Sequence, residues 1–131
     1  MGGDMDDKVK ALQGLIETFI YDLAQLMAAL NPPMEYLDPV AAKALRESIY
    51  PYHEMGYTLA PDFGDKGEVE TEGLEKPNQR IHAKVIISDR SVPIDRFDRR
   101  LPAERRKWRL NLIISPALDR IEHVSIEPHE V

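Results

Sequence analysis

The chain has 131 residues, a formal net charge of −6, no cysteine, and 43% hydrophobic and 31% charged residues. This length and composition are typical of one folded domain and argue against wholesale disorder. The lack of cysteine excludes disulfides, thiolate metal sites and cysteine nucleophiles. It also fits a reducing compartment, and neither a secretory signal nor a membrane-length apolar run is evident, so we expect a cytoplasmic protein.

The charge is unevenly distributed along the chain. Residues 1–79 hold 6 Lys/Arg and 15 Asp/Glu, whereas residues 80–131 hold 11 Lys/Arg and 8 Asp/Glu. The acidic and basic halves could attract each other within one chain or between copies, or could attract charged partners.

A long amphipathic helix is predicted from about Asp4 to Leu30. Seven apolar residues alternate at +3 and +4 spacing, the heptad pattern of a coiled coil or of a helix packed on another helix. These residues are Val9, Leu12, Ile16, Phe19, Leu23, Leu26 and Leu30. Leu15, Ile20 and Met27 widen this stripe, as in a core-facing helix. The stripe can pack on its own chain or on a second copy. A helix longer than about 30 Å is hard for a small domain to cover, so we expect a homodimer or larger oligomer with the stripe as its protein interface.

A second, shorter helix follows. Asn31-Pro32-Pro33 should end the first helix, and Asp38-Pro39 has the pattern of an N-cap and first helical residue. Pro51 should end the second helix near Tyr50. The short connection predicts a helical hairpin over residues 4–58. A polar linker covers residues 59–79, with a short edge strand at Glu68–Thr71.

Residues 80–128 have the alternating apolar and polar pattern of β-strands. Strands are expected at Arg80–Ser88 and Lys107–Ser115, and a turn at Pro116–Asp119 leads into a returning strand at Arg120–Ile126. Amphipathic helices would cover one apolar face of such a sheet. We therefore predict a single α+β domain over residues 1–131, with a helical hairpin packed on a small antiparallel sheet of about three to four strands.

His82-Ala83-Lys84, followed after four residues by Asp89, resembles the H-x-K-x4-D motif of the phospholipase D superfamily. In that family a strand places His and Lys on one face, the His attacks a phosphodiester, and the Lys holds the phosphate oxygens. The resemblance implies an alternative function as a phosphodiesterase with His82 and Lys84 in these roles. The motif is incomplete, because the Gly-Ser pair and the Asn that follow it in the family are missing here.

An Arg-rich connection joins the first two long strands. Arginine suits bidentate phosphate contacts, and aromatic residues such as Phe97 can stack on bases. The connection is thus a candidate contact for nucleic acid or for an acidic partner, although Trp108 falls on the apolar face of its strand, which favours a place in the core. The candidate contact residues are Arg96, Arg99, Arg100, Arg105, Arg106 and Arg109.

The C-terminal stretch contains His123, Glu127, His129 and Glu130 without a standard ligand spacing, so we predict neither a metal nor a cofactor. No catalytic set stands out. Our leading hypothesis is a non-enzymatic assembly or regulatory protein that binds itself and another protein. Nucleic acid is the alternative partner, and no membrane contact is expected.

Overall fold

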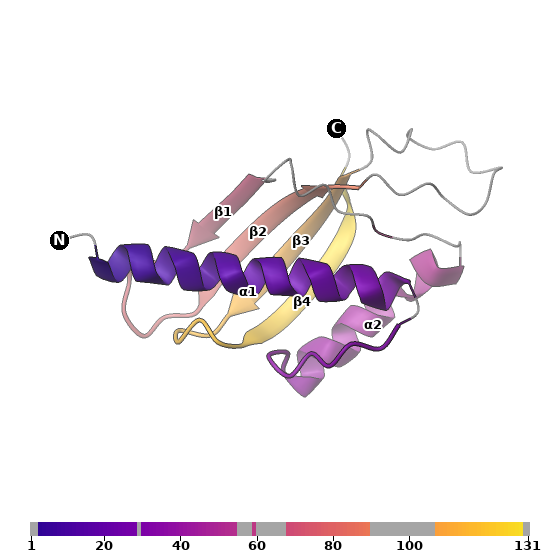
Figure 1. Cartoon of the computed structure of the whole chain (residues 1–131), viewed down its shortest axis with the longest axis horizontal. Coiled ribbons are helices and arrows are strands. Elements are labelled where there is room, and N and C mark those ends of the chain that lie inside the picture. The colour runs from indigo at the N-terminus through magenta and orange to yellow at the C-terminus, as the bar shows by residue number, and fades with distance from the viewer. Residues whose placement is uncertain (1–2, 29, 55–58, 60–67, 90–106, 130–131) are drawn as a thin grey trace.

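A computed structural model of the chain describes residues 3–28, 30–54, 59, 68–89 and 107–129. Two helices, α1 (Gly3–Met27) and α2 (Pro39–Glu54), precede four strands. The strands are β1 (Glu68–Glu72), β2 (Ile81–Ser88), β3 (Lys107–Ile114) and β4 (Ile121–His129). They form one antiparallel sheet in the order β1-β2-β3-β4. In Figure 1, α1 crosses one face of this sheet and α2 lies beside β4. The predicted α+β class, with the helices first, is confirmed.

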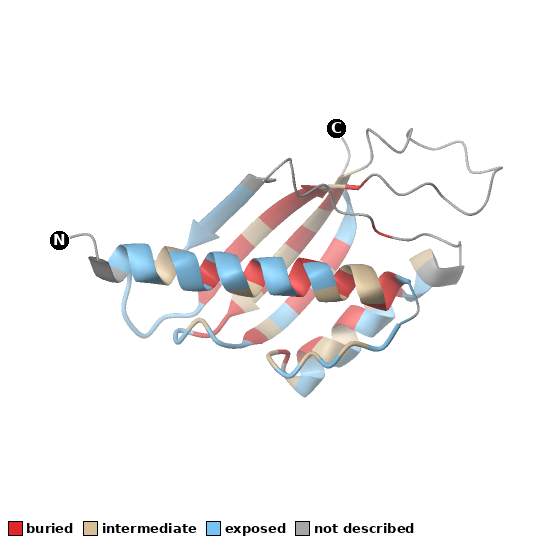
Figure 2. Ribbon diagram, viewed as in Figure 1, coloured by how far each residue is buried: buried red, intermediate tan, exposed pale blue. Residues whose placement is uncertain are grey.

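The apolar stripe of α1 packs on the sheet. Leu12, Ile16, Phe19 and Leu23 follow the +4, +3, +4 spacing of one helix face, and all are at most 4% exposed. They belong to the same core cluster as the inward-facing residues of β2, β3 and β4. Figure 2 shows this layer of buried residues in the sheet behind α1. The helix ends at Met27, before the predicted stop, and Leu30 lies outside it and is 57% exposed.

The expected alternation sets the two faces of the sheet. In β3, every second residue from Trp108 to Ile114 is buried. The register aligns these residues with the buried residues of β2 and β4, so the apolar side chains form one face toward α1. His82, Lys84, Asn111 and Ser125 point to the other face, which an antiparallel sheet can leave in contact with water.

The two helices are joined by a connection that runs along the start of β4. Leu37 forms a parallel bridge with Ile121. The Ile121 N–H donates to the Tyr36 carbonyl at 2.8 Å, and the Asp38 N–H donates to the Ile121 carbonyl at 3.0 Å. These bonds place the beginning of α2 at the outer side of β4.

The cap of α2 is confirmed, but its predicted end is wrong. The Ala42 N–H donates to the Asp38 carbonyl at 2.8 Å, as expected for a helix that starts at Pro39. Pro51 lies inside α2, and the helix continues to Glu54. Proline removes one helical hydrogen bond, but Pro51 is exposed, so water can replace that bond near the end of the helix.

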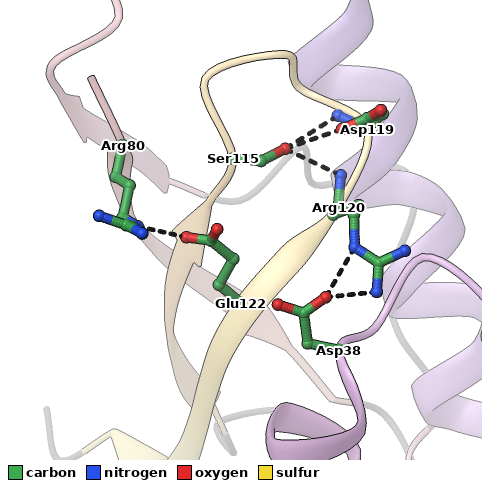
Figure 3. A network of polar contacts seen from close by, with 6 residues as sticks. All are labelled: Asp38, Arg80, Ser115, Asp119, Arg120 and Glu122. Carbon is green, nitrogen blue, oxygen red and sulfur yellow. Dashed lines mark hydrogen bonds and ion pairs between the residues drawn. The ribbon is translucent and has the colours of Figure 1, made fainter. Parts of the chain in front are cut away.

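Polar contacts tie the turn between β3 and β4 to its neighbours (Figure 3). The Ser115 hydroxyl donates to the Asp119 carboxylate at 2.9 Å and accepts from the Arg120 N–H at 3.1 Å. The Arg120 guanidinium in turn pairs with Asp38, at 2.6 Å from Nε to Oδ1. Arg80, just before β2, pairs with Glu122 of β4 at 2.6 Å. These contacts hold the β3–β4 hairpin to the residue before α2 and to the residue before β2.

The outer side of β4 is covered further along by α2. The Ser48 hydroxyl donates to the Ile126 carbonyl at 3.1 Å and accepts from the Ile126 N–H at 3.4 Å. It therefore satisfies two backbone groups that the edge of a sheet otherwise leaves unpaired. Pro128, which has no N–H, also lies in this edge strand, where proline is tolerated. One edge of the sheet is thus closed within the chain.

Candidate functional site

The predicted interface residues of α1 already have a partner within the chain. Leu12, Ile16, Phe19, Leu23 and Leu26 are each at most 9% exposed and contribute to the core. A second copy could reach them only if the sheet moved away. Val9 is half-buried and Leu30 is exposed, so these two ends of the stripe are the parts that remain accessible.

The residues of the H-x-K-x4-D pattern do not share one face. His82 and Lys84 lie on the face of β2 that points away from α1. Asp89 continues the alternate positions of β2 that face α1, so it lies on the opposite face from His82 and Lys84. It is 1% exposed and accepts a hydrogen bond from the Trp108 indole N–H at 2.7 Å. The strand therefore separates the carboxylate from the proposed nucleophile and phosphate ligand.

Asp89 belongs instead to a buried polar contact that the sequence did not indicate. Trp108 is 1% exposed, and the Tyr52 ring of α2 meets its ring edge-on, at 4.8 Å between centroids. This arrangement joins the end of α2 to β2 and β3. Burying a carboxylate is costly unless it is hydrogen-bonded, which explains why the indole N–H is directed at Asp89. The structure thus gives Asp89 and Trp108 a structural role.

Most of the Arg-rich connection lies outside the described residues. This holds for Arg96, Arg99, Arg100, Arg105 and Arg106. Arg109 is described, and its guanidinium forms an ion pair with Glu127 of β4, with Nε at 2.9 Å from Oε1. The expectation that Trp108 lies in the core is confirmed.

The C-terminal His and Glu residues are spread along β4. His123, Glu127 and His129 alternate on one face of the strand, and Glu130 lies outside the described residues. Among the residues that the structure describes, no group of three or more His, Cys, Asp or Glu side chains could hold a metal ion. The returning strand, which was predicted to end at Ile126, continues as far as His129.

A half-buried hydrogen bond joins α1 to the loop before α2. The Tyr36 hydroxyl donates to the Asp22 carboxylate at 2.6 Å. Burial, together with this hydrogen bond and the negative charge of Asp22, raises the pKa of the Tyr36 hydroxyl well above its ordinary value. The contact fixes the loop that runs beside Ile121, and we assign it a structural role.

The candidate binding site is the open edge of the sheet, which we define as β1, Glu68–Glu72. Within the described part of the chain, no strand lies beyond β1. Val69 is 46% exposed although its register partner Val85 is 1% exposed, and Glu70, Thr71 and Glu72 are exposed as well. An edge strand directs every second pair of backbone N–H and C=O groups outward, and these groups can pair with another strand. Among the described residues, the open edge therefore combines outward-facing backbone groups with an apolar residue on the core face.

The helix layer extends beyond this edge. In Figure 1 the N-terminal turns of α1 pass the outer side of β1. With 25 residues, α1 is about 37 Å long, whereas four strands span only about 14 Å between their outer axes. We call residues 5–9 of α1 the overhang. Met5 is 36% exposed and Val9 is half-buried, although both continue the spacing of the buried stripe that starts at Leu12.

The edge strand itself was predicted and is confirmed by β1, but its role as a candidate binding site was missed because its residues lie in a stretch dominated by linker composition. The signal is the alternation of Glu68-Val69-Glu70-Thr71-Glu72, which has the period of a strand. A short edge strand was expected there, but an apolar stripe that continues past the sheet became visible only once the helix and strands were placed together.

Comparison with known proteins adds no relative: no protein-family model, curated protein or solved structure matches this chain. Among the described residues, no helix is both long and apolar enough to cross a membrane.

Proposed function

We propose that this protein is a non-enzymatic binding module that docks an extended segment of another polypeptide on the open edge. The segment would form a fifth strand beside β1, with the overhang above it. The observation that carries the proposal is the exposure of Val69 on the same face as the fully buried Val85. A strand added there would bury Val69 and pair the outward backbone groups, as in the strand-addition mode of peptide recognition.

The proposal accounts for a difference between the two edges of the sheet, of which one is covered and the other is open. The β4 edge is covered by residues 36–38 and by the Ser48 hydroxyl. Within the described part of the chain no strand lies beyond β1, a strand of five residues in which glutamates alternate with Val69 and Thr71. Short length and charge discourage unspecific pairing of an edge. They leave room for a partner whose side chains complement that charge.

Self-association through this edge is disfavoured. Two antiparallel β1 strands paired about their central residue would set Glu70 directly opposite Glu70, and like charges directly opposite each other are destabilising. A homo-oligomer would have to use other accessible residues, such as Leu30 or Tyr21. It remains a prediction that the solution mass will test.

Hydrogen exchange tests the proposed docking. The amides of residues 68–72 are monitored with and without short peptides in which Val alternates with Lys, Glu or Thr. We expect at least one peptide to slow exchange in β1 and in the overhang. If none of the three alters exchange there at millimolar concentration, the proposed function is wrong.

A second candidate function is nucleic-acid binding through the Arg-rich connection. Ser88 and Lys107 are register partners, so residues 90–106 leave and rejoin the sheet at one point, next to Arg109. Phosphate contacts predict an affinity for single-stranded DNA that falls steeply with salt. Unchanged affinity after Arg99, Arg100, Arg105 and Arg106 are replaced by Ala would contradict this function. The phosphodiesterase alternative has no comparable support, because Asp89 lies on the other face from His82.

A further inference from the structure

The side of β1 that is already paired shows which kind of strand fits this sequence. On one face of the sheet, Glu70 lies opposite Lys84 and Glu72 lies opposite His82. On the other face, Val69 lies opposite Val85 and Thr71 opposite Ala83. Over residues 82–85, the strand that pairs with β1 therefore alternates basic and apolar residues, with the basic residues beside Glu70 and Glu72 and the apolar residues toward the core. The next residue, Ile86, is apolar and pairs with Glu68.

The open side of β1 presents the same two faces. Side chains of a strand point alternately above and below the sheet, so a strand on either side of β1 meets the same rows. Glu70 and Glu72 are exposed on the face away from α1, and Val69 is exposed on the face toward it. The overhang continues the spacing of the apolar stripe through the half-buried Val9 and the exposed Met5, and the N-terminal turns of α1 extend past β1 in the view of Figure 1.

We propose that the segment docked on the open edge is one in which Lys or Arg alternates with apolar residues. This inference rests on the proposed function and names the chemistry of its partner. The segment lies antiparallel to β1, as β2 does, with its basic residues beside Glu70 and Glu72. Its apolar residues continue the row of Val69 and are covered by the overhang. Opposite charges directly across two strands are favourable, and like charges are unfavourable.

The charge of the edge discriminates against other occupants. An acidic strand would place its carboxylates beside Glu70 and Glu72. A nucleic-acid backbone would bring phosphates to the same glutamates and has no amide groups in the spacing of a strand. A second copy that paired through β1 would repeat the glutamate contacts described above. Only a basic strand satisfies the backbone, the glutamates and Val69 together.

The test measures the affinity of two short fluorescent peptides by anisotropy, one alternating Lys with Val and one alternating Glu with Val. We expect the wild-type protein to bind the Lys peptide at least about tenfold more tightly than the Glu peptide, from two cross-strand pairs that change from attraction to repulsion. The double variant Glu70→Lys/Glu72→Lys should reverse this preference. The matched control Glu17→Lys/Glu47→Lys changes two exposed glutamates of α1 and α2 by the same charge and should keep the wild-type preference.

The outcomes separate the chemistry of the partner from the docking itself. If hydrogen exchange shows either peptide on β1 but the two affinities are equal, or the Glu70→Lys/Glu72→Lys variant keeps the wild-type preference, the basic partner is wrong and the docking stands. If neither of these peptides slows exchange in β1 but the Thr-Val peptide does, the basic partner is wrong and the docking stands. If none of the three slows exchange there, both proposals fail. Circular dichroism confirms that each variant is folded, so that a lost preference reports on binding.

Discussion

Val69 and Val85 face each other across two strands on the core side of the sheet, yet Val85 is 1% exposed and Val69 is 46% exposed. The apolar layer of this protein thus ends at β1 on the sheet side but continues in α1 above it. Because α1 extends past the edge of the sheet, its apolar stripe leaves surface that an added strand could cover. This mismatch is the basis of the proposed function.

The placement of the α1 stripe predicts a large difference between two leucines of the same heptad pattern. Leu23 is fully buried, whereas Leu30 is 57% exposed. Leu23→Ala should lower the free energy of unfolding by about 3 to 5 kcal/mol, because it removes packing and leaves a cavity. Leu30→Ala, the matched control, should change it by less than about 0.5 kcal/mol. Urea denaturation measures both, and a small loss for Leu23→Ala would mean that the stripe does not lie in the core.

Solution mass then tests whether copies associate. Because Leu23 is in the core, Leu23→Asp would bury a charge and unfold the protein, so it would not report on an interface. Leu30→Asp and Tyr21→Asp change exposed residues, so they should leave the fold intact. A wild-type oligomer that dissociates in either variant would locate a self-association surface on the outside of the helix layer.

The connection between β1 and β2 requires a glycine at position 73. Gly73 has a φ of +94°, and a Cβ there would lie 2.8 Å from the Arg80 carbonyl oxygen. Gly73→Ala should therefore cost about 1 to 3 kcal/mol. Gly14 is the matched control, because it is helical and a Cβ added there would meet nothing within 4 Å. Gly14→Ala should instead stabilise the protein by about 0.5 to 1 kcal/mol. Equal effects in urea denaturation would contradict this backbone geometry.

Ser48 is predicted to protect the β4 edge. Its hydroxyl bonds both backbone groups of Ile126, so Ser48→Ala should lower the free energy of unfolding by about 1 to 2 kcal/mol. It should also speed hydrogen exchange of the Ile126 amide. Glu47→Ala, at the exposed neighbouring position of α2, should do neither. Unchanged exchange at Ile126 in the Ser48 variant would show that the hydroxyl does not cover this edge.

The Tyr36–Asp22 contact predicts a loss of stability at high pH. Since the folded state raises the pKa of the Tyr36 hydroxyl above the unfolded value of about 10, the contribution is fully present below about pH 10. It is lost as the pH rises further, because the unfolded chain then releases a proton that the folded chain retains. Tyr36→Phe lacks this proton. The difference in stability between wild type and Tyr36→Phe, from urea midpoints, should be smaller at about pH 11 than at about pH 8. An unchanged difference would contradict the raised pKa of the half-buried Tyr36 hydroxyl.

Much of the fold follows from residue periodicity. Alternate apolar residues from Ile81 to Ile87 and from Trp108 to Ile114 fix which face of each strand is buried, and Asp38-Pro39 marks the start of α2. The helical stripe from Leu12 to Leu26 indicates an apolar face with equal clarity. Periodicity does not reveal what covers that face, because a sheet and a second helix both accept the same stripe.

Other features depend on contacts between distant residues. Asp89 continues the alternate buried positions Ile81 to Ile87, so strand alternation alone predicts that it lies on the opposite face from His82. Its hydrogen bond to Trp108 could be identified only from the folded structure. The exposure of Val69 likewise depends on which strands are neighbours. A local pattern cannot show that β1 is an edge while β4 is covered by Ser48.

The most direct test of the central claim is to supply the missing strand within the same chain. A Lys-Val alternating segment is attached to the N-terminus by a flexible linker, since α1 begins near the open edge in Figure 1 and tethering raises the effective concentration to the millimolar range. The control carries the same segment with alternate residues replaced by Pro, which cannot donate hydrogen bonds to β1. We predict a higher Tm for the Lys-Val fusion than for the control, by about 3 to 4 °C for each kcal/mol gained. Equal Tm values would contradict the docking of a strand on this edge.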